Sequence, residues 1–371
     1  PVQAQTFATE RRRLRYPVPV NRSFFLPPDE APVSPRARYC EELLDALALG
    51  VGGYFEKNPG FRRFGVALSG GRDSLLTLLV AHRYARKVRP DDPGSLISAF
   101  YMASRHSSAE TEQAARTVCA ELGIPLSVSS IEPAVERERA AIQEMLGPDQ
   151  PLTPVTEQNI QARLRGQRMW NWSNSSAGLF LQTGNMSERA VGYTTVGGDL
   201  EGGLAVIANV PKTVVAVLLE HLRDRLGLDG ISQALARPAG PELAPDQVGE
   251  EELMPFPILD ACFHLFAEEK LTPAEVGEVL EGMFPELPAA ILRGHVEKFV
   301  RLFLGSIYKW VQAPLSLHLG NLDLDRERAL QLPVVNRPEW AHPAPPPAPR
   351  RPRGSRKPAG PGKKVRGRRS R

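Results

Sequence analysis

The chain has 371 residues, of which 42% are hydrophobic and 24% charged, so a folded core is expected and a mainly disordered chain is excluded. Eleven of its 46 Lys and Arg residues lie between Arg350 and Arg371. The rest of the chain has 35 Lys and Arg and all 42 acidic residues, and so a net charge of −7. The basic character therefore belongs to the end of the sequence, and it is poor evidence for a nucleic-acid-binding fold.

Cysteine usage and hydropathy indicate the cellular compartment that is expected for the protein. Cys40, Cys119 and Cys262 are far apart and form no CxxC pair, which argues against a zinc ribbon or a disulfide framework. We find neither an apolar run of about 18 residues nor a signal-like start, so no membrane span is expected and a reduced, cytoplasmic setting is the simplest interpretation. Because the sequence starts with Pro1, we expect it to be a fragment of a longer product.

Taken in chain order, helix signals begin near Pro35, and short apolar segments then alternate with helical periods. The apolar segments predict strands at 64–68, 96–102, 126–131 and 179–183. The helical periods predict helices at 73–87, 109–122, 157–174 and 211–226. This alternation predicts an α/β fold with a doubly wound, mostly parallel sheet that is covered by helices on both faces.

The remaining segments suggest the domain boundaries. Residues 1–34 are rich in Pro and Arg, as in a linker, and a folded domain is expected from 35 to 337. Within it, residues 229–256 are rich in Pro, Gly and acids and predict a mobile loop, whereas 258–304 predict a C-terminal helical extension. Residues 338–371 are dominated by Pro, Arg, Lys and Gly and are expected to be a disordered tail.

The stretch from Ala67 to Ser74, ALSGGRDS, lies where the first predicted strand passes into a helix. Paired glycines let backbone N–H groups approach phosphate oxygens closely, and the N-terminus of the helix attracts the same anion. Asp73 adds a hard oxygen ligand that suits Mg²⁺ held against phosphates. The alternative is a plain turn between strand and helix, and the stretch is neither a Walker A loop nor GxGxxG.

The narrower pattern, Ser-Gly-Gly-x-Asp-Ser, resembles the pyrophosphate loop of the N-type ATP pyrophosphatases, which have an adenine nucleotide alpha hydrolase-like fold. Four further blocks follow in the order of the NAD synthetase family: NIQARLRG from Asn159, TGNMSE from Thr183, GGDLEGG from Gly197 and VPKT from Val210. The resemblance runs from about Arg62 to Val335 and is strongest to the synthetase part of the glutamine-dependent form. Residues 10–24 look like the connector that follows the glutaminase domain of that form, a domain that we expect to be absent here.

This resemblance implies a reaction. ATP activates the carboxylate of nicotinic acid adenine dinucleotide (deamido-NAD) as an adenylated intermediate with release of pyrophosphate, and ammonia then displaces AMP to give NAD. The ammonia is supplied directly or from glutamine. An anion attacks an anion, so backbone dipoles, Mg²⁺ and basic side chains are expected to offset the repulsion.

The resemblance also implies a set of binding residues, carried over by position. Those expected to bind ATP are Ala67, Leu68, Ser69, Gly70, Gly71, Arg72, Asp73, Ser74, Arg105, Ser107 and Thr183. Those expected to bind deamido-NAD are Asn159, Arg163, Glu188, Asp199, Lys212 and Lys309. Asp73 and Glu188 are the expected Mg²⁺ ligands, and Glu188 contacts Mg²⁺, the dinucleotide or both.

Some roles stay open at this point. Lys212 and Lys309 stabilise either phosphate charge or the dinucleotide, and Asp199 orients either the nicotinate ring or ammonia. Two rival interpretations are a tRNA-modifying ATP pyrophosphatase that holds RNA with the basic tail, and a docking subunit that recruits a partner through that tail. The acidic globular part makes a nucleic-acid partner unexpected, whereas a homo-oligomer is expected from the resemblance.

Overall fold

The computed structural model describes residues 16, 17, 19, 22–26, 34–238, 240, 242–244 and 249–310. Most of the predicted linker at 1–34, including most of the proposed connector, therefore lies outside the described residues. The predicted tail at 338–371 lies wholly outside them, as do residues 311–337. Over the described ranges, no helix combines the length and the apolar composition needed to cross a bilayer.

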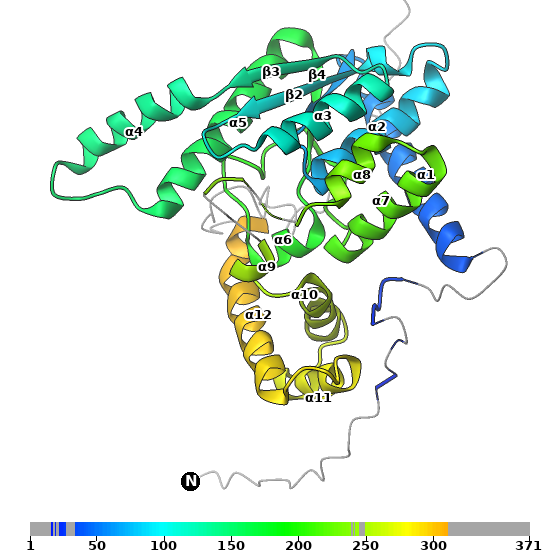
Figure 1. Cartoon of the computed structure of the whole chain (residues 1–371), viewed down its shortest axis with the longest axis vertical. Helices are drawn as coiled ribbons and strands as arrows, with labels where there is room; N and C mark the ends of the chain where they lie inside the picture. Colours follow the sequence, from blue (N-terminus) through cyan, green and yellow to red (C-terminus); the bar gives the residue numbers. More distant parts are fainter. Residues whose placement is uncertain are drawn as a thin grey trace, which may run out of the picture. The chain divides into compact units, whose positions relative to one another are not determined.

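A five-stranded sheet forms the centre of the α/β part (Figure 1), in the strand order β3-β2-β1-β4-β5. Every pairing is parallel. The strands are β1 (Arg63–Ala67), β2 (Ile97–Ala103), β3 (Leu126–Ser130), β4 (Gly178–Gln182) and β5 (Leu204–Ala205). The predicted doubly wound parallel sheet is confirmed. Only β5 was not predicted, because two residues are too short to show a periodic pattern.

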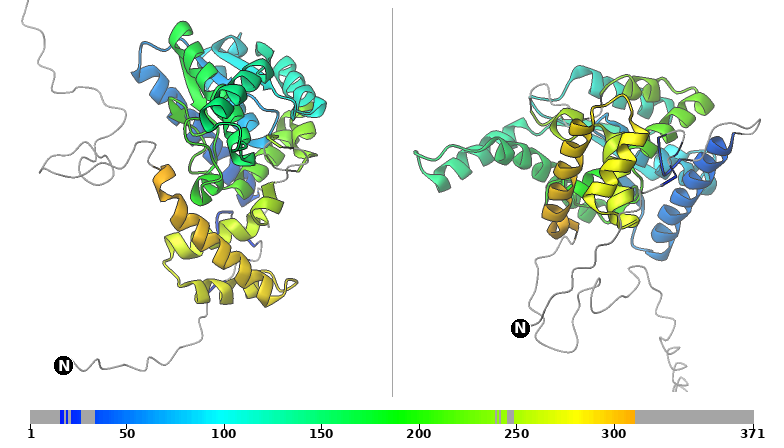
Figure 2. Two further views of the ribbon diagram at one scale, coloured as in Figure 1. Left: turned by 90° about the vertical axis from the view of Figure 1, so that its left-hand side faces the viewer. Right: turned by 90° about the horizontal axis from the view of Figure 1, so that it is seen from below.

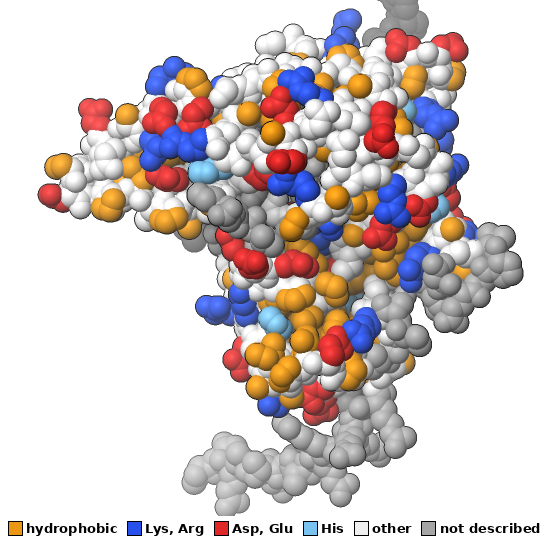
Figure 3. Space-filling view, viewed as in Figure 1, with side chains coloured by type: hydrophobic (Ala, Val, Ile, Leu, Met, Phe, Trp, Pro, Cys, Tyr) orange, Lys and Arg blue, Asp and Glu red, His pale blue; other side chains and the backbone are white. Residues whose placement is uncertain are grey.

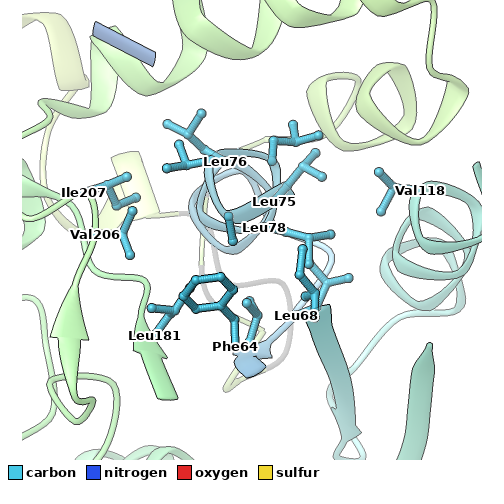
Figure 4. Close-up of a cluster of buried hydrophobic side chains, with 14 of the residues drawn as sticks. Phe64, Leu68, Leu75, Leu76, Leu78, Val118, Leu181, Val206 and Ile207 are labelled. Atoms are coloured by element: carbon cyan, nitrogen blue, oxygen red, sulfur yellow. The ribbon is translucent and has the colours of Figure 1, made fainter. Parts of the chain in front are cut away.

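Helices cover both faces of the sheet. Successive side chains of a strand point to opposite faces, so each strand contributes apolar side chains to both. Phe64 and Val66 of β1 belong to one apolar core, while Ala67 packs into another. The helices on the first face are α1 (Pro35–Lys57), α2 (Arg72–Val88), α3 (Ala109–Glu121), α7 (Lys212–Leu226) and α8 (Asp229–Leu235). Figure 4 shows the centre of this core, where apolar side chains of α2 lie over Phe64 and Leu181 of the sheet.

The second face is covered by α5 (Pro154–Ser176) and the first turns of α4 (Glu132–Leu146). The two helices form a hairpin that projects beyond the sheet (Figures 1 and 2). The helical period at 157–174 predicted α5, whereas α4 was not predicted, although Pro133 near its start and Gly147 at its C-cap are typical helix boundaries. A short 3-10 helix at Pro93–Leu96 leads into β2.

A helical extension with its own apolar core follows the sheet, as predicted for residues 258–304. It comprises α10 (Phe256–Phe263), a π-helical turn (His264–Glu268), α11 (Pro273–Met283) and α12 (Ala289–Trp310), and it packs on α6 (Met186–Val191). Figure 3 shows hydrophobic side chains gathered over this extension, whereas charges of both signs are interspersed over the α/β part.

The prediction of a mobile loop across 229–256 was wrong at both ends. Helix α8 occupies the start of that range, and α9 (Gly249–Glu252) lies near its end. In α8, Ile231 and Ala234 are buried in the main core. This tertiary packing stabilises a helix at the start of a range whose overall Pro- and Gly-rich composition predicts a loop.

Glu41 ties α1 to two other helices. Its carboxylate accepts hydrogen bonds from Arg83 of α2 (2.8 Å) and His221 of α7 (2.6 Å), and it also pairs with Arg225 of α7. Partial burial raises the pKa of this carboxyl, but the hydrogen bonds from Arg225, His221 and Arg83 outweigh burial and lower the pKa to about 2.

A pH-dependent stability follows from this depressed pKa. A carboxyl whose folded-state pKa lies below its unfolded value stabilises the fold above the unfolded pKa, and the contribution is lost as pH falls through the folded pKa. Between about pH 5 and pH 2, we expect the free energy of unfolding to fall by about 1–2 kcal/mol more in the wild type than in Glu41→Gln, after allowing for solvent screening. Urea unfolding measures this, with the exposed neighbour Glu42→Gln as control. Equal losses of stability in the wild type and Glu41→Gln would show that the pH dependence does not come from Glu41.

Candidate functional site

The site lies where the order of the strands changes direction. The chain steps from β1 to β2 and β3 on one side, while β4 and β5 lie on the other. Ligands of open parallel sheets bind outside the carboxyl ends of the strands at such a switch point. The loop after β1 carries Gly70 and Asp73, and the segment after β4 carries Thr183 and Glu188, so the fold brings the two predicted motifs to one edge.

The glycine loop presents backbone amides. Gly71 is the N-cap of α2 and no side chain caps that end, so the amides of the first turn are free to face an anion. Ser69 and Ser74 hold the loop together, with their hydroxyl oxygens 3.0 Å apart and Ser74 donating to the Gly71 carbonyl at 3.1 Å. These hydrogen bonds within the loop hold it as a cradle that suits a phosphate group.

Gly70 is required by both its conformation and its surroundings. Its φ is +78°, and a Cβ there would lie 2.2 Å from the carbonyl oxygen of Thr111. We expect Gly70→Ala to destabilise the protein by about 1–3 kcal/mol, because strain and overlap with backbone act together. The matched control is Gly71→Ala, whose φ is negative and whose Cβ would meet only the Ser69 hydroxyl, at 3.3 Å. Thermal unfolding compares the two, and equal losses would contradict this account.

An acid–lysine cluster lies beside the cradle. Lys212, the first residue of α7, is 6% exposed, and its ammonium contacts Asp73 in the first turn of α2 and Glu188 in the first turn of α6. The distance from Lys212 Nζ to Glu188 Oε1 is 2.9 Å. The Phe256 ring lies 5.4 Å from the same ammonium. Three residues predicted from separate motifs therefore meet at one point.

Burial and charge shift the pKa values of this cluster in opposite senses. Burial raises the pKa of Glu188 to about 7, with Lys212 lowering it and Asp73 raising it. Burial lowers the pKa of Lys212, but the two carboxylates outweigh burial and raise it above its ordinary value. The ammonium is therefore charged at neutral pH. Burial and repulsion from Asp73 disfavour the charged form of Glu188.

Polar residues that were not among the predicted site residues hold this cluster in place. Asn185, which is fully buried, donates to Asp73 at 3.0 Å and accepts the Glu188 backbone N–H at 2.9 Å. Ser187 accepts from the Lys212 N–H at 2.8 Å and donates to Asp260, which in turn accepts from the Thr213 hydroxyl at 2.6 Å. Asn185 is an N-cap and so had a sequence signal, whereas Asp260 had none.

A second group of predicted residues surrounds the segment 192–199. The Asn159 side chain accepts from Thr195 at 2.7 Å, and Arg163 donates to the Val196 carbonyl at 3.1 Å, so both lie on one face of α5 as expected. Asp199 accepts from the Thr195 N–H at 2.6 Å, and burial raises its pKa. Lys309 donates to the carbonyls of Gly192 and Thr194 at 2.7 Å each.

The other predicted ATP residues are more scattered in their contacts. Arg105 follows β2 and pairs with Glu132 and Glu136, and Ser107 accepts from the Ser104 N–H at 3.0 Å. The Arg72 side chain donates to the carbonyls of Leu235 and Arg237. Thr183 directly follows β4 at the same edge of the sheet as the loop. Their contacts with ATP stay predictions.

Glu242 was also missed, and it lies next to the cradle. Its carboxylate accepts from the Ser108 N–H and hydroxyl at 3.1 and 2.7 Å and from the Thr111 hydroxyl at 2.8 Å. Arg237 donates to it at 2.8 Å. Thr111 is the residue against which Gly70 packs, so part of the Pro-rich segment after α8 contacts the N-terminus of α3 beside the loop.

The cluster fits a magnesium ion. Asp73 and Glu188 supply two hard carboxylates that converge on a single cation, the Lys212 ammonium. Within the described ranges no set of three or more His, Cys, Asp or Glu side chains is arranged around a metal position. A Mg²⁺ ion is usually bound by one or two carboxylates of the protein and takes its other ligands from phosphates and water.

Comparison with known proteins gives a consistent result. A family model described as NAD synthase matches residues 43–286. The glutamine-dependent NAD(+) synthetase of Acinetobacter baylyi is 32% identical over 298 residues, which are 80% of this chain and 51% of that protein. That of Aquifex aeolicus is 32% identical over 327 residues, 87% of this chain and 53% of that protein. The chain spans about half the length of the curated relatives it matches.

Solved structures agree. A glutamine-dependent NAD(+) synthetase from Cytophaga hutchinsonii aligns with a TM-score of 0.63 over 80% of this chain and 54% of that one, at 24% identity, which supports the fold. One from Acinetobacter baumannii, in complex with ADP, aligns with a TM-score of 0.55 over 83% of this chain and 51% of that one, at 27% identity. Sequence, site geometry and fold lead to one conclusion: the chain belongs to the NAD synthase family.

Proposed function

We propose that this chain carries out the ATP-dependent amidation of nicotinic acid adenine dinucleotide to NAD, releasing AMP and pyrophosphate. The observation that carries the proposal is the meeting of Asp73, Glu188 and Lys212 beside the Gly70 cradle, in a chain of this family. The supplier of nitrogen is ammonia, provided directly or by a glutaminase activity of the kind that the names of the relatives imply.

The cradle and the cluster divide the work on ATP. The amides of Gly70 and the first turn of α2 bind the phosphates that leave as pyrophosphate, whereas the Gly71 N–H donates to the Ser69 hydroxyl at 3.2 Å. Lys212 neutralises charge that builds up on phosphate oxygens when the carboxylate of the dinucleotide attacks the α-phosphorus. Asp73 and Glu188 would hold Mg²⁺, which would supply further neutralisation of the phosphates.

The segment 192–199 and the residues around it form the site for deamido-NAD in this proposal. Asn159 and Arg163 fix that segment from α5, and Lys309 fixes it from α12. Asp199, buried against Thr195, orients either the nicotinate ring or the incoming ammonia. Arg105, Ser107 and Thr183 contact the nucleotide of ATP. A homo-oligomer and a cytoplasmic location complete the proposal.

One incubation tests the function. The 371-residue chain is mixed with ATP, Mg²⁺, ammonia and deamido-NAD, and NAD and AMP are followed by chromatography. We expect both products in equal amounts, each dependent on deamido-NAD. Supplying ammonia removes any dependence on a glutaminase. Release of AMP without NAD, or pyrophosphate release only when tRNA is added, would overturn the proposal and favour a tRNA-modifying enzyme.

A further inference from the structure

A cavity of about 280 Å³ lies between α1, α2 and α7, away from the cradle. It is close to the lower end of the about 300–1,000 Å³ that is typical of small-molecule sites. Its apolar lining consists of Leu44, Leu79, Leu222 and Leu226. Arg83, Arg86, Lys87 and Arg225 also line it, and the last three of these are exposed. Asp45 also lines the cavity, which therefore combines a hydrocarbon surface with a mainly cationic rim.

The charges of the rim are not balanced. Arg83 pairs with Glu41 and Asp45 of α1, Lys87 pairs with Asp45 at 3.5 Å, and Arg225 pairs with Glu41. Four cationic side chains thus face two carboxylates. Arg86 makes no ion pair with any residue in the described part of the chain. The excess positive charge at this rim would attract an anion.

His82 adds a polar group to the wall of the cavity. It lines the cavity, and its Nε2 is buried without a hydrogen-bond partner among the described residues. Buried polar atoms are nearly always hydrogen-bonded in native proteins. Burial, and then the charge of Arg86, lower the pKa of His82 to about 4, so the imidazole is neutral at pH 7 and adds no charge to the rim.

The cavity is remote from the acid–lysine cluster but is built on the same helices. Asp73 lies in the first turn of α2 and Lys212 begins α7, whereas Arg86 and Arg225 lie near the other ends of those helices. At 1.5 Å per residue, roughly 20 Å of helix separates the two places in each case. A molecule bound here would not overlap the cradle, and it would contact the two elements that position Asp73 and Lys212.

We propose that this cavity is a second ligand site that takes a small amphipathic anion. The phosphate or carboxylate head binds the rim formed by Arg83, Arg86, Lys87 and Arg225, and a short apolar chain lies on the leucines. Arg86, which has no competing carboxylate, contributes most to binding the head.

Calorimetric titration with octyl phosphate, octanoate, inorganic phosphate and octyltrimethylammonium tests the site. We expect octyl phosphate or octanoate to bind about tenfold or more tightly than inorganic phosphate, because the chain buries apolar surface. The cation is expected not to bind. Which of the two anions binds more tightly identifies the preferred head. Absence of binding by both, or equal binding of the cation, would overturn the proposal.

Variants locate the binding. Arg86→Gln is expected to weaken octyl phosphate binding roughly five- to tenfold, as for loss of a charge-assisted contact at a partly exposed site. Arg89→Gln is the matched control, because Arg89 follows the same helix without lining the cavity. Leu226→Ser is expected to reduce the advantage of octyl over inorganic phosphate. Equal affinities in the two arginine variants, or displacement of octyl phosphate by ATP, would show that it binds elsewhere.

Discussion

Asp73→Asn is expected to lower the rate of NAD formation by on the order of 10²–10³-fold while the protein stays folded. The substitution keeps the size of the side chain and an oxygen that can accept from Asn185, which donates to Asp73 at 3.0 Å. It removes the negative charge that Lys212 contacts and that, in the proposed function, holds Mg²⁺. The fold tolerates the change because Glu188 still pairs with the buried ammonium.

Two measurements separate this role from a structural one. Mn²⁺ binding, followed by its paramagnetic resonance signal, is expected to weaken in Asp73→Asn, while the thermal midpoint shifts by no more than a few degrees. Glu112→Gln serves as control, because that carboxylate lies on α3 and pairs only with Arg116 among the ion pairs of the described chain. Near-normal turnover by Asp73→Asn would remove Asp73 from the metal site.

The part of the site that the sequence could predict is the part encoded locally. The loop from Ala67 to Ser74 joins a strand to the next helix, so its motif carries its own structural context. Asp73 and Glu188 could be expected to approach each other because each follows the end of a strand, and such ends meet at one edge of a parallel sheet. The resemblance named both residues, and the topology explains why they meet without reference to side-chain packing.

Contacts between distant segments could not be predicted in this way. Ser187 and Asp260 are 73 residues apart, and their hydrogen bond depends on how α10 packs against α6 and α7. Glu242 lies in a Pro-rich stretch whose composition predicts only a loop, yet it makes four hydrogen bonds next to the cradle. Such residues are placed by tertiary packing, which has no periodic signal in one sequence.

Lys212→Met is expected both to abolish most turnover and to destabilise the protein, by about 3–5 kcal/mol near pH 8. Lys212 is 6% exposed and is the cation that Asp73 and Glu188 share, so its loss leaves two partly buried carboxylates facing each other. Methionine fills similar space without supplying charge. Loss of the ammonium also removes the neutralisation of phosphate charge on which the proposed mechanism depends.

The destabilisation is expected to depend on pH. Burial raises the pKa of Glu188 to about 7 even with Lys212 present, and Lys212 is the main influence that lowers it, so the pKa rises further in the variant. A carboxyl whose folded-state pKa is raised contributes stability that is complete below its unfolded pKa and is lost as pH rises through the folded value. Lys212→Met is therefore expected to cost less stability near pH 5 than near pH 8.

A second substitution separates the two effects of Lys212. Lys212→Met combined with Glu188→Gln removes the unpaired carboxylate, so stability near pH 8 is expected to recover in part while turnover stays lost. Lys309→Met is the control, because that lysine donates to backbone carbonyls of Gly192 and Thr194 and bridges no carboxylate pair. Urea unfolding at the two pH values decides the matter. If the loss of stability is the same at both pH values, or the double variant is no more stable than Lys212→Met, the ammonium does not act by holding two partly buried acids together.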